Sequence, residues 1–163
     1  MTSESERDEF LDLVDSHGPA VFAMLRRLCG NVHDAEDAFQ DTAVRVWRSF
    51  SNRPRLRNPR AWLMTIAYRA FVDHRARRVP AEALVDVPDP RSDPPDVQAE
   101  RSDECRRLSA AMEGLPDTMR QILVLHYTGG LTIRQTAELL GVSEGTVKSR
   151  LNAALSRLRS ILQ

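Results

Sequence analysis

The sequence has little of what secreted, membrane-spanning or β-rich proteins need. Its 163 residues include two cysteines, Cys29 and Cys105, which are too few for a disulfide framework. Aromatic residues make up 6% of the chain, which suits a helical bundle better than a β-rich fold. No apolar run approaches the roughly 20 residues of a membrane span, and the acidic N-terminus lacks a signal-peptide pattern. We therefore expect a cytoplasmic protein without membrane insertion.

The usual motifs of catalysis and of metal or cofactor binding are absent as well. The sequence has no glycine-rich phosphate loop and no nucleophile elbow. Cys29 and His33 lie four residues apart, but no second pair accompanies them, so a buried thiol beside a surface histidine is the favoured interpretation. His126 and Tyr127 could be called an acid–base pair, but no nucleophile or metal accompanies them, and core packing plus a surface imidazole explains them. The sequence thus predicts no enzyme, no catalytic residue, no metal site and no cofactor.

The net charge is zero, but the charges are strongly segregated along the chain. Met1–Asp41 carries a net charge of −7 and Ala43–Arg78 a net charge of +9. Val79–Glu104 returns to −6, and Cys105–Gln163 is again basic at +4. Two basic blocks, each beside an acidic one, indicate a protein that touches a polyanion at two places and another partner elsewhere.

The first half of the chain has the apolar spacing of helices. Residues at steps of three and four predict helices over Arg7–His17, Ala20–Leu28, His33–Phe50 and about Asn58–Arg78. Gly18-Pro19 is expected to separate the first two helices. Asn58 is a predicted N-cap, because Pro59 suits the first helical position.

Polar residues on two of these predicted helices are candidates for function. His33–Phe50 leaves a polar outer ridge of Asp37, Gln40, Asp41 and Arg45, for which a plain solvated face is the alternative. The helix from Asn58 carries a surface on which aromatic and basic residues alternate: Tyr68, Arg69, Arg75, Arg77 and Arg78. Such a mixture suits stacking on unpaired bases beside phosphate contacts, although an amphipathic helix with a solvated basic face has the same pattern.

A proline-rich segment divides the chain. Residues 79–103 hold five of the nine prolines, several aspartates and no helical stripe, which is typical of a flexible linker. The expected fold is therefore all-α, with one small helical domain at 5–78 and a second at 104–163. In the second domain, helices are predicted over Glu104–Leu115, with Leu108 facing inward, and from Pro116 to Tyr127.

The last stretch, Thr132–Leu162, has the pattern of a helix-turn-helix. Thr132 and Ser143 are good N-caps, and Gly141 suits the left-handed conformation that ends a helix. Ala137 permits close approach of the second helix, which would enter a DNA major groove. Its predicted outward side chains are Lys148, Ser149, Asn152 and Arg157. An ordinary αα-hairpin is the alternative.

Several strings resemble the RNA polymerase sigma-70 family. DAEDAFQD (34–41), RVW (45–47), NPRAWLMTIAY (58–68) and DHRARR (73–78) resemble its second conserved region. LPDTMRQILVLHYTGGLT (115–132) and TAELLGVSEGTVKSRL (136–151) resemble the fourth. Only the short linker stands between them, as in the extracytoplasmic-function (ECF, group IV) sigma factors. The resemblance implies a promoter-specificity subunit of core RNA polymerase that recognises −35 and −10 promoter elements and promotes DNA melting.

The resemblance also implies which residues bind which partner. The polymerase contacts, to the clamp of the largest catalytic subunit, would be Asp37, Gln40, Asp41 and Arg45. The loop Ser51–Arg57 and the following helix would meet the −10 element, where the family captures a flipped base. The −10 DNA contacts would be Arg53, Arg55, Arg57, Trp62, Tyr68, Arg69, Arg75 and Arg78. The −35 contacts would be Ser143, Thr146, Lys148, Ser149, Arg150, Asn152 and Arg157. The flap of the other large polymerase subunit and an anti-sigma factor are further expected partners.

Two positions depart from the family pattern. Arg69 stands where the family usually has asparagine, and Ala153 where it often has a basic residue; both changes bear on promoter specificity. A different class of protein also fits the residues, namely a stand-alone helix-turn-helix repressor or activator that uses its first domain as a sensor or dimerisation module. Such a regulator would bind duplex operator DNA tightly without polymerase.

Overall fold

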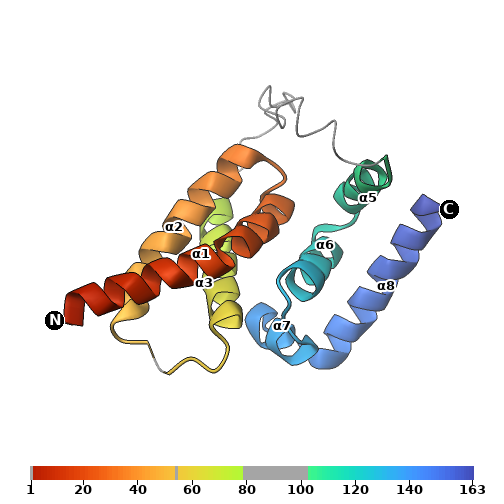
Figure 1. Ribbon diagram of the computed structural model, residues 1–163. Coiled ribbons are helices and arrows are strands. Elements are labelled where there is room, and N and C mark those ends of the chain that lie inside the picture. Colours follow the sequence, from red (N-terminus) through yellow and green to blue (C-terminus); the bar gives the residue numbers. More distant parts are fainter. Residues whose placement is uncertain (1, 54, 79–102) are drawn as a thin grey trace. The chain divides into compact units, whose positions relative to one another are not determined.

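The computed structural model describes residues 2–53, 55–78 and 103–163, and every regular element in these ranges is a helix (Figure 1). The chain divides into two compact units, Met1–Pro88 and Asp89–Gln163. This confirms the expected all-α fold with two helical domains. The predicted linker, 79–103, lies outside the described residues except for its last residue, and the exact domain boundaries stay predictions.

The first unit begins with one long helix, α1 (Thr2–Cys29), where two helices were predicted. Pro19 lies inside it and removes one i→i−4 hydrogen bond. Burial of Val21, Met24 and Leu25 on the C-terminal side offsets that loss. Gly18 is buried, and a Cβ there would make an ordinary van der Waals contact with Cζ of Phe39, at 3.6 Å. The predicted break at Gly18-Pro19 was therefore wrong, because tertiary packing carries the helix through it.

Helices α2 (Val32–Phe50) and α3 (Pro59–Arg77) pack against α1 and against each other. Asn31 caps α2 by accepting a hydrogen bond from the Asp34 N–H, and Asn58 caps α3 in the same way from Ala61. The second of these caps was predicted, as was Pro59 at the start of α3. The three helices enclose an apolar core. The residues that α2 and α3 contribute to it include Ala35, Ala38, Val46, Phe50, Leu63, Met64, Ala67 and Phe71.

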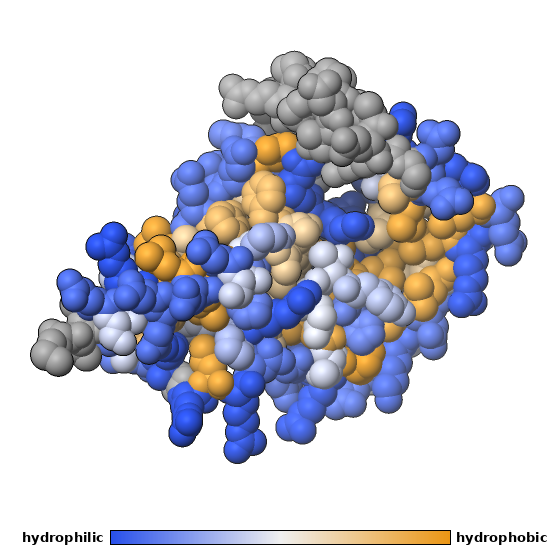
Figure 2. Space-filling view, in the orientation of Figure 1, coloured by the Kyte–Doolittle hydropathy of each residue, from blue (hydrophilic) through white to orange (hydrophobic). Residues whose placement is uncertain are grey.

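The second unit contains α5 (Asp103–Glu113), α6 (Asp117–Leu123), a π-helical turn η1 (Val124–Thr128), α7 (Ile133–Leu140) and α8 (Glu144–Leu162). α5, α6 and α7 all pack against α8. Their core consists of Ala111, Leu115, Ile122, Leu123, Ala137, Val147, Leu151, Ala154 and Leu158. Hydrophilic side chains cover most of the visible surface along α1 and along the outer side of α8 (Figure 2).

The π-helical turn was not predicted, and it changes which side chains are buried. Gly129 N–H donates to the Val124 carbonyl at 2.8 Å, five residues back, and this wider turn shifts the helical register. Val124 and Leu125 are buried, whereas Tyr127 is 60% exposed instead of lying on the apolar face. Leu108 on α5, also predicted to face inward, is 38% exposed.

Candidate functional site

The predicted polar ridge of α2 exists, and one of its members links α2 to α3. Asp37 and Gln40 are exposed, while Asp41 and Arg45 are half-buried. Arg45 pairs with Asp41 at 2.9 Å and with Asp73 of α3 at 2.8 Å. The hydrogen bond to Asp73, reinforced by the one to Asp41, raises the pKa of Arg45 although burial acts in the opposite direction. Arg45 is thus permanently charged and held between two carboxylates.

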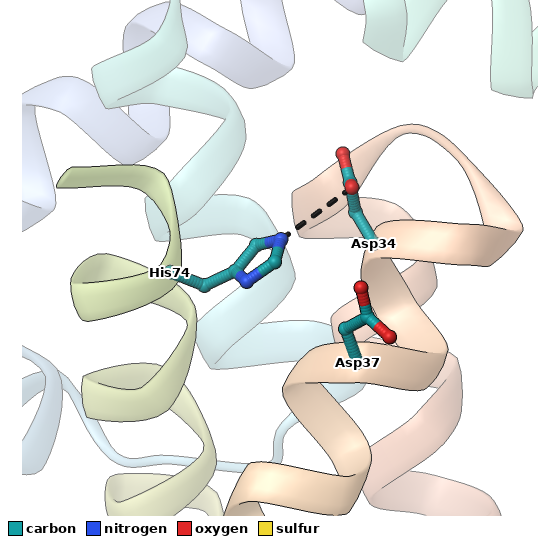
Figure 3. Close-up of side chains that lie close together, drawn as sticks. All are labelled: Asp34, Asp37 and His74. Carbon is teal, nitrogen blue, oxygen red and sulfur yellow. Dashed lines mark hydrogen bonds and ion pairs between the residues drawn. The ribbon is translucent and has the colours of Figure 1, made fainter. Parts of the chain in front are cut away.

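A polar cluster joins the start of α2 to the end of α3. Asp34 is only 5% exposed, and its carboxylate accepts a hydrogen bond from Asn31 Nδ2 at 2.7 Å. Figure 3 shows the His74 ring pointing from α3 toward Asp34, with Nε2 3.4 Å from the carboxylate. Arg78 also pairs with Asp34, at 2.5 Å. These contacts connect the two helices through one buried charge.

The same cluster has side chains of the types that bind metals. One ligand atom each from Asp34, Asp37 and His74 lies within 4.8 Å of the others. The Asp34 carboxylate, however, is already neutralised by Arg78 and hydrogen-bonded by Asn31, so a cation would have to displace both. We therefore assign the cluster to helix pairing.

Cys29 is half-buried, where the sequence analysis expected a buried thiol. Burial, the largest cause, and the nearby Asp34 charge raise the pKa of its thiol while Arg78 acts in the opposite direction, and the net result is a pKa of about 12. Because a metal ligand must be a thiolate, this environment disfavours metal binding. His33, the other member of the proposed pair, is exposed and lies 3.6 Å from Asp37.

Arg53, the first arginine of the loop after α2, contacts side chains of α1 and α2. The guanidinium carbon of Arg53 lies 3.5 Å from the centre of the Phe50 ring, and Nη1 donates to the Phe50 carbonyl at 2.8 Å. The other end of the guanidinium forms an ion pair with Glu9 of α1. Arg55 and Arg57, in contrast, are exposed.

The predicted basic and aromatic surface of α3 is only partly present. Arg69, Arg75, Arg77 and Arg78 are exposed, and Trp62 is half-buried. Tyr68 is 7% exposed, with its ring 5.9 Å from that of Phe71, so the prediction that it lies on the surface was wrong. The period of α3 explains the error, because Tyr68 follows Met64 by four residues and shares its buried face. To stack on a base, this ring would have to leave the core.

A cavity of about 640 Å³ lies between α1 and the loop that follows α2. Glu9, Asp12 and His17 line it from α1, and Arg53, Arg55 and Leu56 line it from the loop. Its size is in the range of small-molecule pockets. Sequence reasoning missed the three α1 residues. The available signal was the acidic N-terminal block next to the arginine-rich one.

The helix-turn-helix is built as predicted. Thr132 Oγ1 accepts a hydrogen bond from the Gln135 N–H, and Gln135 Oε1 accepts one from the Thr132 N–H, which completes a capping box at the start of α7. Gly141 has φ +67°, the left-handed conformation expected of it. Ser143 caps α8 by accepting from Thr146 N–H at 3.1 Å, and its hydroxyl also lies 2.9 Å from that of Thr146.

The predicted −35 residues lie on the side of α8 that faces away from the core, or at its N-cap. Lys148, Ser149, Asn152 and Arg157 are exposed together with Ser143, while Thr146 and Arg150 are half-buried. The opposite side of α8 is buried through Val147, Leu151, Ala154 and Leu158. A short first helix, a left-handed glycine and a capped second helix with an exposed polar face define a helix-turn-helix DNA-binding domain. The class is a helical DNA-binding protein with two domains.

Comparison with known families specifies that class. The family model of sigma-70 region 2 matches residues 13–79, and that of sigma-70 region 4 matches residues 105–158. The ECF RNA polymerase sigma factor SigK of Mycobacterium ulcerans is 33% identical over 98% of this chain and 89% of its own length. SigE of Mycolicibacterium smegmatis is 36% identical over 93% of this chain and 60% of its own length. The chain belongs to the sigma-70 family, in the group of ECF sigma factors.

Solved structures agree with this family. The sigma factor RpoE of Bartonella quintana, in complex with the anti-sigma factor NepR, has a TM-score of 0.70 and 25% identity over 96% of this chain and 95% of its own. CnrH, in complex with the cytosolic domain of CnrY, has a TM-score of 0.68 and 25% identity over 96% of this chain and 88% of its own. As a sigma factor the chain is not an enzyme, as the sequence predicted. Within the described residues, the helices are too short or too polar to span a membrane.

Proposed function

We propose that this sigma factor positions core RNA polymerase by gripping a promoter at two points. The second unit reads the −35 element through α8, and the first unit opens the −10 element through α3 and the loop before it. The observation that carries this division is the placement of exposed basic side chains. They lie on the outer face of a capped recognition helix in one unit, and on a loop beside a cavity of about 640 Å³ in the other.

Polymerase docking is assigned to the ridge of α2. Asp37 and Gln40 are its most exposed members, and Asp41 presents the carboxylate oxygen that Arg45 leaves available. These groups face the clamp of the largest catalytic subunit. The second unit binds the flap of the other large subunit. Because Arg45 is held by two carboxylates, its main contribution to docking is to hold Asp41 in place.

Melting of the −10 element is assigned to the cavity between α1 and the loop. Unstacking a base costs a few kcal/mol, which a fitted pocket repays. Asp12 offers a carboxylate that accepts hydrogen bonds from the amino group of a base, and Leu13 and Leu56 provide apolar walls. Arg55, which lines the cavity, and Arg57, which is exposed on the same loop, then hold the flanking phosphates.

Recognition of the −35 element is assigned to the exposed face of α8. Lys148 and Arg157 neutralise phosphates, whereas Ser149 and Asn152 are short enough to reach base edges in the major groove. Ser143 and Thr146 hold the start of α8 through their cap, and this start presents the positive end of the helix dipole to a phosphate.

An anti-sigma factor is the proposed regulator in the cytoplasm. RpoE and CnrH, the two similar structures above, were both solved with a bound partner, which for RpoE is an anti-sigma factor. A partner that covered the α2 ridge of this chain would prevent polymerase docking. The test is whether an anti-sigma domain encoded beside the gene forms a complex with the chain and blocks transcription.

The central experiment maps transcript starts after overexpression and then rebuilds the strongest mapped promoter in vitro. Core polymerase from the same bacterium should start at the mapped site when the chain is added and not without it. Asp37→Arg combined with Gln40→Ala should lower core affinity at least tenfold, because it reverses a charge in the docking ridge. Asp15→Arg, on an exposed face of α1, is the matched control and should bind core normally. Tight binding of the chain alone to duplex promoter DNA would instead support a stand-alone regulator.

A further inference from the structure

The Arg53 guanidinium is engaged by other groups of the protein, which leaves it little free to bind DNA. Its guanidinium stacks on Phe50, donates to the Phe50 carbonyl and pairs with Glu9. The side chain is only 24% exposed. A second contact between the loop and α1 lies beside this ion pair: Ser51 Oγ donates a hydrogen bond to Glu6 at 3.2 Å.

The hydrogen bond and the ion pair both come from one face of α1. Glu6 and Glu9 are three residues apart and therefore neighbours on the helix surface. They hold Ser51 and Arg53, the residues with which the loop leaves α2. Glu9 and Arg53 both also line the cavity, so the ion pair lies in its wall.

We infer that Glu9 and Arg53 form a positioning pair that fixes the start of the loop and keeps the cavity open before DNA arrives. Arg53 is then a positioning residue rather than the direct −10 DNA contact that the sequence analysis predicted. The inference rests on the proposed role of this cavity in capturing an unpaired base. A preformed pocket lowers the cost of ordering the loop when the base enters.

A direct phosphate contact by Arg53 leads to the opposite expectation. Glu9 would then compete with the phosphate, and its removal would free the guanidinium and strengthen DNA binding. In a positioning pair, removal of Glu9 loosens the loop and slows melting. The sign of the effect of Glu9→Gln therefore separates the two roles.

The experiment measures promoter opening by holoenzyme made with the full chain. The probe is a DNA fragment carrying the strongest mapped promoter, and the readout is the rate at which its −10 thymines become reactive to permanganate. Glu9→Gln should lower this rate about three- to tenfold, the range expected for loss of one partly exposed charge-assisted hydrogen bond. Asp8→Asn, an equal charge change on a neighbouring exposed residue, should leave the rate unchanged. An unchanged or faster rate with Glu9→Gln overturns the inference.

Two further variants decide the matter if Glu9→Gln lowers the melting temperature. Arg53→Lys keeps the positive charge but loses the forked geometry, so a positioning role predicts slower opening and a phosphate contact predicts little change. The exchanged pair, Glu9→Arg with Arg53→Glu, should recover at least half of the wild-type rate if the two side chains act on each other. A rate below that of both single variants would show that position 53 faces DNA. If wild-type holoenzyme itself does not open the promoter, the proposed function fails instead.

Discussion

Gly141 and Gly145 lie four residues apart in the helix-turn-helix, and alanine should change stability in opposite directions at the two positions. Gly141 has φ +67°, where an L-residue is strained, whereas Gly145 has ordinary helical geometry in the first turn of α8. A Cβ at Gly141 would meet no atom within 4 Å, and one at Gly145 would meet only Ser143 Oγ, at 3.9 Å. Neither substitution causes a clash, so the backbone alone determines each effect.

The expected magnitudes follow from the backbone. The left-handed conformation costs alanine roughly 1–2 kcal/mol, and the loss of unfolded-state freedom returns about 0.4–1 kcal/mol. Gly141→Ala should therefore destabilise the second unit by about 1 kcal/mol. Gly145→Ala should stabilise it by about 0.5 kcal/mol, because alanine is the better helix former. For a unit of this size, 1 kcal/mol corresponds to about 4–8 °C in melting temperature.

Differential scanning calorimetry of the full chain measures both shifts, and the chain contains its own control. Both tryptophans, Trp47 and Trp62, lie in the first unit, so the fluorescence transition should not move in either variant. The calorimetric transition of the second unit should fall with Gly141→Ala and rise with Gly145→Ala. The reasoning is refuted if Gly141→Ala is as stable as the wild type, or if both variants shift the transition in the same direction.

Three other measurements test separate parts of the structure. Iodoacetamide at pH 8 should modify Cys105 quickly and Cys29 only after unfolding, because Cys105 is exposed and the pKa of Cys29 is raised to about 12; equal rates would contradict this. Asp34→Ala should lower the free energy of unfolding, measured with urea, by about 2 kcal/mol, because it leaves Asn31 and Arg78 without their shared partner. Glu36→Ala, at an exposed position, should lower it by less than about 0.5 kcal/mol. Lys148→Ala should weaken promoter binding by the holoenzyme and lower the slope of log affinity against log salt by about one, and an unchanged slope would remove Lys148 from the phosphate contacts.

Most of the fold could be predicted because local signals and burial agree. Thr132, Gly141 and Ser143 each have the geometry that their residue types favour, so the helix-turn-helix could be read directly from the sequence. The long α1 could not, because Gly18-Pro19 is a local stop signal that only contacts from other helices overcome. The π-helical turn was equally hidden, since the bond from Gly129 to Val124 depends on how the next segment packs.

The candidate site was less predictable than the fold, because side-chain pairing is not visible in sequence. Arg53, Arg55 and Arg57 alternate along one loop, yet Glu9 holds only the first of them. Tyr68 looks like a surface aromatic among arginines, but the helical period places it in the core. Asp34 was one of several acids in the first turn of α2, and only the structure shows it buried and paired with Arg78.

The double ion pair of Arg45 has a thermodynamic consequence for the proposed function of the first unit. Arg45 joins Asp41, on the ridge proposed to bind polymerase, to Asp73 of α3, the helix proposed to bind the −10 element. Under that proposal, a ligand that moves Asp41 alters the ion pair with Asp73, so the energies of polymerase binding and promoter binding would be linked. Such linkage is reciprocal by necessity: whatever factor polymerase adds to DNA affinity, DNA adds to polymerase affinity. If Arg45 carries this linkage, the free sigma factor should bind promoter DNA more weakly than the holoenzyme does.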